Sequence, residues 1–154
     1  MTDQPRPKDT PTPEETRIWV AMNRLTRRIQ AEISAELKAA GLPPLKWYDV
    51  LWSIERRGGA LRPNDLEADV VFEQSSLSHL SKRLIAEGLL EAVSCETDRR
   101  GKVLQITPKG RDIRAKMWGI YGPRLHEMMA PIAKDPGWEG LLRAADLADW
   151  QGKT

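Results

Sequence analysis

The sequence predicts a mostly α-helical protein with one small β-hairpin, and three observations support this fold class. Apolar residues recur at three- and four-residue steps over several long stretches, which is the period of an amphipathic helix. Glycine and proline stand at the ends of those stretches, where helices stop. Two short runs, at residues 90–95 and 102–106, flank a polar segment at 96–101, which is the pattern of a hairpin.

Composition is compatible with one domain that has a real core. The chain has 154 residues, is 40% hydrophobic and carries a formal net charge of +2, which is weak evidence for a polyanionic partner. Its single cysteine, Cys95, excludes an intramolecular disulfide framework. Nothing in the sequence reads as a signal peptide or as an apolar run of membrane-spanning length, so we expect a cytoplasmic protein that does not associate with membranes.

The chain begins with a segment unsuited to folding and continues into a long helix. Residues 1–13 contain four prolines and no aliphatic residue after Met1, so we expect a disordered arm. From about 14 to 40 an amphipathic helix follows, with Thr12 or Thr10 as its N-cap and Gly41 at its end. At 1.5 Å per residue this helix is roughly 40 Å long, which exceeds what a small globule covers. Its apolar stripe therefore needs another partner, either the C-terminal helices of the same chain or a second copy.

Two shorter helices come next. Residues 45–57 place Tyr48, Leu51, Trp52 and Glu55 at three- and four-residue steps, and two glycines close that helix. A short helix around residues 63–68 begins with Pro63, a residue favoured in the first turn.

The stretch from residue 71 to 106 carries the chemistry. Leu77, Leu80, Leu84 and Ile85 form one apolar helix face, while the other face offers hydrogen-bond donors and positive charge with few bulky groups. Such a face suits a helix laid in the major groove of DNA. Gly88 stops the helix at its C′ position, and the hairpin that follows carries two arginines at its tip.

The rest of the chain is predicted to be helical. Thr107 and Pro108 form a helix start, and an apolar pattern continues to Pro131. Because Gly119, Gly122 and Pro123 interrupt the pattern, we expect a kink or a break near residue 121. A final helix is expected from about 138 to 150.

A helix followed at once by an arginine-tipped hairpin is a winged helix-turn-helix, and the chain resembles the MarR family of dimeric transcriptional regulators from about residue 16 to 150. The residues that carry the resemblance are LSKRL at 80–84, EGLL at 87–90, DRR at 98–100 and ITPKG at 106–110. Glu73 stands where the family more often has a serine cap, so the cap can pass to Ser75. His79 stands where the family often has arginine.

The resemblance implies a division of the chain and a function. Residues 14–44 would be a first dimerisation helix and linker, 45–107 a winged helix-turn-helix lobe, and 108–150 the C-terminal dimerisation helices. The implied function is a homodimeric repressor that binds double-stranded DNA at a pseudo-palindromic operator and is released by a small effector. The predicted DNA-binding residues are Gln74, Ser75, Ser76, Ser78, His79, Lys82 and Arg83 in the major groove, with Arg99, Arg100 and Lys102 at the wing.

The resemblance also implies a site for the effector, where the dimerisation helices meet the DNA-binding lobe. Large aromatic side chains beside guanidinium groups would suit a small aromatic or anionic ligand, because stacking supplies area and charge supplies orientation. Core packing is the competing interpretation of the same residues. The predicted pocket residues are Trp19, Met22, Trp47, Tyr48, Arg111 and Arg114.

Other chemistry has little support in the sequence. His79 and His126 are the only histidines and no Cys/His cluster exists, so no metal and no cofactor are predicted. Glu96 beside Cys95 disfavours the thiolate, which argues against a redox role. There is no phosphate loop and no nucleophile motif, so we predict no enzyme. The alternative to a regulator is a winged-helix module for protein contacts, which would show no salt-dependent binding to DNA.

Overall fold

The computed structural model describes residues 10–71, 76–94 and 101–143. The fold is mostly helical with a small three-stranded antiparallel sheet, as the sequence predicted apart from one strand. The elements are α1 (Pro13–Ala39), α2 (Leu45–Arg56), β1 (Ala60–Leu61), α3 (Pro63–Asp69), α4 (Leu77–Ala86), β2 (Leu90–Ser94), β3 (Lys102–Ile106) and α5 (Pro108–Ala133). The described part of the predicted last helix, residues 138–143, is also helical.

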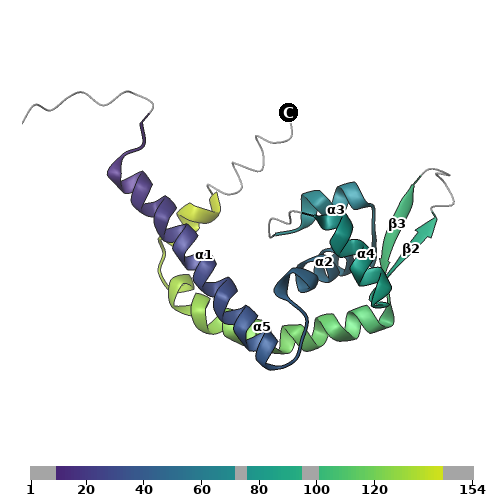
Figure 1. Cartoon of the computed structure of the whole chain (residues 1–154). Coiled ribbons are helices and arrows are strands. Elements are labelled where there is room, and N and C mark those ends of the chain that lie inside the picture. Colours follow the sequence, from purple (N-terminus) through teal and green to yellow (C-terminus); the bar gives the residue numbers. More distant parts are fainter. Residues whose placement is uncertain (1–9, 72–75, 95–100, 144–154) are drawn as a thin grey trace, which may run out of the picture.

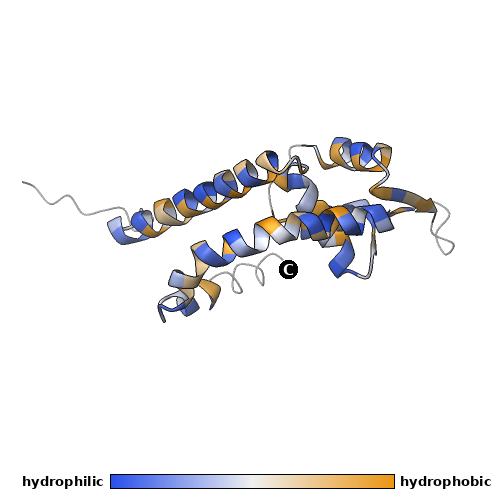
Figure 2. Ribbon diagram, turned by 90° about the horizontal axis from the view of Figure 1, so that it is seen from below, coloured by the Kyte–Doolittle hydropathy of each residue, from blue (hydrophilic) through white to orange (hydrophobic). Residues whose placement is uncertain are grey.

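Two parts are evident in Figure 1: a lobe formed by α2 through β3, and a helical pair formed by α1 and α5. The two long helices run side by side, and α5 continues under the lobe, so it belongs structurally to both parts (Figure 1). Figure 2 shows hydrophobic positions recurring along α1 between hydrophilic ones. The predicted arm at residues 1–9 lies outside the described residues.

Helix α1 begins as its sequence predicted. The Thr12 hydroxyl accepts a hydrogen bond from the Glu15 amide at 3.2 Å, and the Glu15 carboxylate accepts one from the Thr12 amide at 2.6 Å. This reciprocal arrangement is a capping box, which satisfies two amides at the helix start. Gly41, with φ of 68°, follows the other end, where a left-handed conformation favours glycine.

The sheet has one strand more than the predicted hairpin. Strands β2 and β3 pair from Leu90 opposite Ile106 to Ser94 opposite Lys102, and β1 adds to the other edge of β3. Gly58 and Gly59, with φ of 91° and 92°, turn the chain from α2 into β1. A two-residue strand is too short to show an alternating pattern, and its pairing depends on tertiary contact. Periodicity in the sequence therefore did not reveal it.

A kink or a break was predicted near Tyr121, and the break is wrong, since α5 continues as one helix through Pro123 and Pro131. A proline inside a helix removes one backbone hydrogen bond, and its ring presses on the carbonyl four residues earlier. That residue is Gly119, which has no side chain to add crowding. Tyr121 and Leu125 pack against the buried cluster between α1, α2 and α5, and this packing holds the helix on both sides of the proline.

Candidate nucleic-acid interface

Helix α4 has the two faces that the sequence predicted. Leu84 is fully buried, and three further apolar residues of the helix pack against the lobe core: Leu77, Leu80 and Ile85. The opposite side is solvent-exposed and carries His79, Lys82 and Arg83, with Ser78 beside them. The lobe therefore presents one positively charged and hydrogen-bonding helix face to solvent, held by an apolar anchor.

The ends of α4 are fixed differently. Ser76, and not Ser75, occupies the N-cap position, and its side chain makes no cap hydrogen bond. At the other end Gly88 adopts φ of 73°, and the Leu89 amide donates to the Leu84 carbonyl at 2.9 Å. This is the geometry of a Schellman motif, in which a glycine at C′ lets the chain reverse.

The motif after the wing fastens α5 to that end of α4. The Thr107 hydroxyl donates to the Gly88 carbonyl at 2.7 Å, and the Lys109 ammonium donates to the Glu87 carbonyl at 2.8 Å. A Cβ on Gly110 would lie 2.2 Å from the Leu89 carbonyl oxygen, so this close approach requires glycine. The residues ITPKG that carried the family resemblance thus connect α4 to the helical pair.

The wing contributes to the same surface only in part. Lys102 begins β3 opposite Ser94 and is exposed. Lys102 and Lys82 both line a groove of about 450 Å³ between α3, α4 and the strands, together with Glu67, whose charge partly offsets theirs. Ser78 also lines the groove, so the structure brings together three predicted DNA-binding residues from α4 and β3. The predictions for Gln74, Ser75, Cys95, Arg99 and Arg100 lie outside the described residues.

Arg83 has a partner within the lobe. Its guanidinium carbon lies 5.8 Å from the ring centre of Trp47, at the start of α2, in a cation–π arrangement. Trp47 also packs against the lobe core. One predicted effector residue therefore supports a predicted DNA-binding residue.

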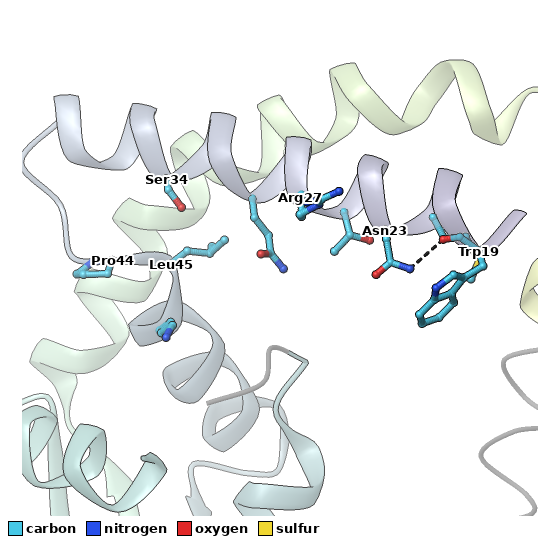
Figure 3. Close-up of a pocket in the computed structure, with 10 residues that line it drawn as sticks. Trp19, Asn23, Arg27, Ser34, Pro44 and Leu45 are labelled. Carbon is cyan, nitrogen blue, oxygen red and sulfur yellow. Dashed lines mark hydrogen bonds between the residues drawn. The ribbon is translucent and has the colours of Figure 1, made fainter. Parts of the chain in front are cut away.

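The six predicted effector residues are not gathered in one cavity. Trp19 and Met22 line a cavity of about 610 Å³ along α1, which Pro44 and Leu45 close at one end (Figure 3). The Asn23 side chain in that cavity donates to the Trp19 carbonyl at 2.8 Å (Figure 3).

A second cavity, of about 380 Å³, lies between α2 and α5 and is rich in aromatic side chains. It is lined by Tyr48, Asp49, Trp52, Val71, Arg114, Trp118, Tyr121 and Leu125. The rings of Tyr48 and Trp118 stack with centres 5.9 Å apart, and Tyr121 packs edge-on against Tyr48 at 5.0 Å. Burial raises the pKa of both tyrosines, so both phenols are neutral at physiological pH.

Glu55 determines where the two predicted arginines lie. Arg111 pairs with the Glu55 carboxylate at 3.0 Å, and Arg114 pairs with its other oxygen. Because Glu55 comes from α2 and the arginines come from α5, these ion pairs join the lobe to the long helix. Arg111 does not line either cavity, whereas Arg114 lines the aromatic one. The heptad-like step from Tyr48 to Glu55 was visible in the sequence, but the partner of Glu55 was not.

Other kinds of site find no support in the part of the chain that the structure describes. No three His, Cys, Asp or Glu side chains there are grouped so that they could hold a metal ion. None of the helices described is long and apolar enough to cross a membrane.

The fold and the α4 surface define a winged helix-turn-helix protein. A sequence model of the MarR family matches residues 40–101. This match confirms the resemblance to the MarR family that the sequence predicted.

Solved structures share the fold over almost the whole chain. AbsC, a MarR family transcriptional regulator from Streptomyces coelicolor, is 21% identical, with a TM-score of 0.77 over 96% of this chain and 100% of that chain. Sco3205, a MarR family transcriptional regulator from the same organism solved in complex with DNA, is 20% identical, with a TM-score of 0.76 over 98% and 92%. The organohalide-sensing regulator RdhR-CbdbA1625 in its 2,4-dichlorophenol-bound form is 20% identical, with a TM-score of 0.68 over 100% and 89%.

Proposed function

We propose that the protein is a sequence-specific DNA-binding transcriptional regulator that acts as a homodimeric repressor on a pseudo-palindromic operator. The observation that carries this proposal is the exposed face of α4, where His79, Lys82 and Arg83 project from an apolar anchor. Lys102 on the wing strand extends the positive charge beside it. The structural likeness to Sco3205, which was solved with DNA, supports the same function.

The residues divide into two roles. Lys82, Lys102 and the wing arginines Arg99 and Arg100 would neutralise phosphates or line the minor groove, which positions the protein without reading sequence. The residues predicted to face the major groove, apart from Lys82, would read bases from α4 and from the segment just before it. They are Gln74, Ser75, Ser76, Ser78, His79 and Arg83. Within that set the Arg83 guanidinium has a defined position, because it lies over the Trp47 ring.

The proposal is tested by first selecting the sequence that the protein retains from fragments of its own genome. Binding to that sequence is then titrated against salt, where each neutralised phosphate adds about 0.9 to the slope of log affinity against log salt. Lys82→Ala should lower this slope by about 0.9, the contribution of one phosphate contact, whereas His79→Ala should change the preferred bases. Lys38→Ala, an exposed lysine at the end of α1, is the matched control.

Three outcomes would contradict the proposal or a part of it. If the chain binds DNA without salt dependence or sequence preference, it is not a sequence-specific regulator. If it binds no DNA at all, the alternative of a winged-helix module for protein contacts takes its place. A lone half-site bound at full affinity would contradict the homodimer, because a two-fold dimer needs half-sites about 10 bp apart.

We also propose that a small aromatic or anionic effector releases the DNA. The likeness to RdhR-CbdbA1625, solved with 2,4-dichlorophenol, supports an aromatic ligand. Two cavities offer aromatic walls, one with Trp19 and one with Trp118. Aromatic carboxylates titrated against tryptophan fluorescence, with Trp19→Phe and Trp118→Phe compared, would identify the cavity. A fluorescence change on adding the carboxylate that neither substitution alters would exclude both cavities as the effector site.

A further inference from the structure

Helix α2 carries a polar stripe in the middle of the lobe. Asp49, Ser53, Arg56 and Arg57 follow one another at steps that keep them on one helix face. Asp49 is 2% exposed and Ser53 is fully buried, although the same helix supplies apolar residues to both cores. A polar group costs free energy when it is buried unless it is hydrogen-bonded, so the partners of this stripe indicate its role.

Residues 69–71, at the end of α3 and the start of the connection to α4, supply a partner to every residue of the stripe. The Val71 amide donates to the Asp49 carboxylate at 3.0 Å. The Ser53 hydroxyl donates to the Asp69 carbonyl at 3.5 Å. The Asp69 carboxylate accepts from Arg56 and Arg57 at 3.0 and 2.8 Å. Helix α2 therefore holds the chain at the last described residues before α4.

The contacts at the two ends of the stripe differ in what they fix. Arg56 and Arg57 are 41% and 59% exposed, and they bind the side chain that closes α3. Asp49 is buried and binds a main-chain amide, while the Val71 side chain is 66% exposed and makes no core anchor. The position of Val71 is therefore set by Asp49 rather than by packing of its own side chain.

Val71 stands five residues before Ser76, the N-cap of α4. A shift of the chain at Val71 would be passed to the start of α4, whose N-cap has no side-chain hydrogen bond to resist it. The C-terminal end of α4 is held by hydrogen bonds at Gly88, Thr107 and Lys109. The first turn is held by the packing of Leu77 against the lobe core. Apolar contacts are less directional than hydrogen bonds, so a shift passed to the N-cap would displace the first turn most.

We propose that Asp49 is a positioning residue for DNA recognition: its carboxylate holds the Val71 amide and thereby sets the orientation of α4 in the groove. The inference rests on the proposed function, because it assumes that α4 reads DNA. Asp49 touches no base. It acts through Val71 on the first turn of α4, where the base-reading residues are concentrated.

The test removes each partner of the bond separately. Asp49→Ala removes the acceptor, and Asp49→Asn restores an oxygen acceptor of the same shape. Val71→Pro removes the donor alone, and Val70, with ψ of 141°, already has the conformation that a following proline requires. Val50→Ala, a fully buried neighbour whose side chain packs in the lobe core, is the control for lost stability.

We expect Asp49→Ala and Val71→Pro each to weaken binding to the selected DNA about tenfold and to alter its base preference, measured where the variants are folded. Asp49→Asn should stay within about threefold of the unmodified protein. The double variant Asp49→Ala with Val71→Pro should bind no worse than the weaker single variant, because both changes break one bond. Val50→Ala should lower the melting temperature and leave the base preference unchanged.

The proposal would be overturned if the losses of DNA affinity in the two single variants added up in the double variant. It would also be overturned if Asp49→Ala, like Val50→Ala, left the base preference unchanged. A readout without DNA separates this failure from failure of the proposed function. In Asp49→Ala the Val71 amide should exchange with solvent at least about tenfold faster, and the amide resonances of α4 should shift. Unchanged resonances in α4 would overturn the positioning role even if the protein binds DNA.

Discussion

The lobe and the helical pair bury their apolar residues in different ways. In the lobe, nine residues from α2, α3, α4, the strands and the turn between α4 and β2 form one buried cluster. The cluster between α1, α2 and α5 has five, and two of those five, Leu45 and Tyr48, come from α2. The lobe closes its core on itself, whereas the helical pair depends on the lobe for part of its core.

Most of the large apolar residues that are exposed in the described part of the chain lie outside the lobe. Ile18 and Trp19 on α1 are 58% and 63% exposed, and Trp118 on α5 is 44% exposed. The short helix after α5 adds Leu141 and Leu142. Soluble proteins rarely expose such a collection of large apolar side chains without a partner. The difference between the two parts teaches that the lobe covers its buried cluster mainly with its own elements, whereas the helical pair leaves large apolar side chains exposed that the proposed homodimer would cover.

The largest expected effect is in the lobe core. Leu84→Ala would leave a cavity beneath α4 and should lower the free energy of unfolding by about 2–5 kcal/mol, measured in urea. Val93→Ala, at a 39% exposed position of β2, is the control and should cost less than about 0.5 kcal/mol. An equal decrease in the free energy of unfolding in both variants would show that Leu84 is not buried in a closed lobe core.

A smaller effect is expected at the exposed end of α1. Trp19→Ala should raise the dissociation constant of the proposed homodimer about 30-fold or more, since a central tryptophan in an interface commonly contributes at least 2 kcal/mol. Sedimentation would measure it, and the helical content should not change. Val71→Ala, equally exposed but in the lobe, should leave the dimer intact. If the unmodified chain is a monomer at micromolar concentration, the dimer itself is wrong.

The sequence predicted most of the fold because local signals fix most of its boundaries. The caps at Thr12 and Thr107 and the glycine at 88 act within one turn of the chain, and each lies where it was expected. Strand β1 and the unbroken α5 depend on contacts between distant residues. Periodicity does not carry that information, and the tertiary structure overrode the local effect of Pro123.

The site was predictable to the same degree. The two faces of α4 follow from its own spacing, and the structure agrees with them. Which residues meet across elements did not follow: Glu55 pairs with both Arg111 and Arg114, and Trp47 lies under Arg83. The polar stripe on α2 had a signal, since Asp49 and Ser53 interrupt an apolar helix at a four-residue step, but its partners at 69–71 were not visible.

Acid should act on the lobe through Asp69. Burial alone would raise the pKa of this carboxyl, but hydrogen bonds from Arg57 and Arg56 outweigh it and hold the pKa below its ordinary value. A lowered pKa in the folded state adds stability above the unfolded value of about 4, and this stability is lost as pH falls through the folded pKa.

Replacing Asp69 by Asn should therefore cost about 1 kcal/mol at neutral pH, a modest value because both arginines are partly solvated. The difference between the two proteins should shrink to nothing in acid, measured by urea unfolding from pH 7 to pH 2. Lys38→Gln changes an exposed cation at the end of α1 and should leave the acid dependence as it was. A difference that is constant with pH would show that the carboxyl makes no contribution through its charge.

The smallest effect on stability is expected from the ion pairs between the two long helices. Measuring it tests whether charge or apolar contact holds the helices together. Arg124 on α5 pairs with Glu32 and Glu36 on α1 and with Glu127 on its own helix. The hydrogen bond from Arg28 and the contacts from Arg124 together lower the pKa of Glu32. Because these groups lie near solvent, Arg124→Gln should lower stability slightly at low salt and not at all near 1 M salt, where the screening length is about 3 Å.

Arg28→Gln breaks a pair within α1 alone, so it is the matched control and should matter still less. If Arg124→Gln instead destabilises the protein at every salt concentration, ion pairs rather than apolar burial hold the pair together. The exposed apolar face of α1 would then not be needed for its stability. A minor loss that disappears at high salt leaves apolar contact as the main force between the helices. Part of that contact lies within the chain at Ile33, Leu37 and Met117, and the rest would form in the proposed homodimer.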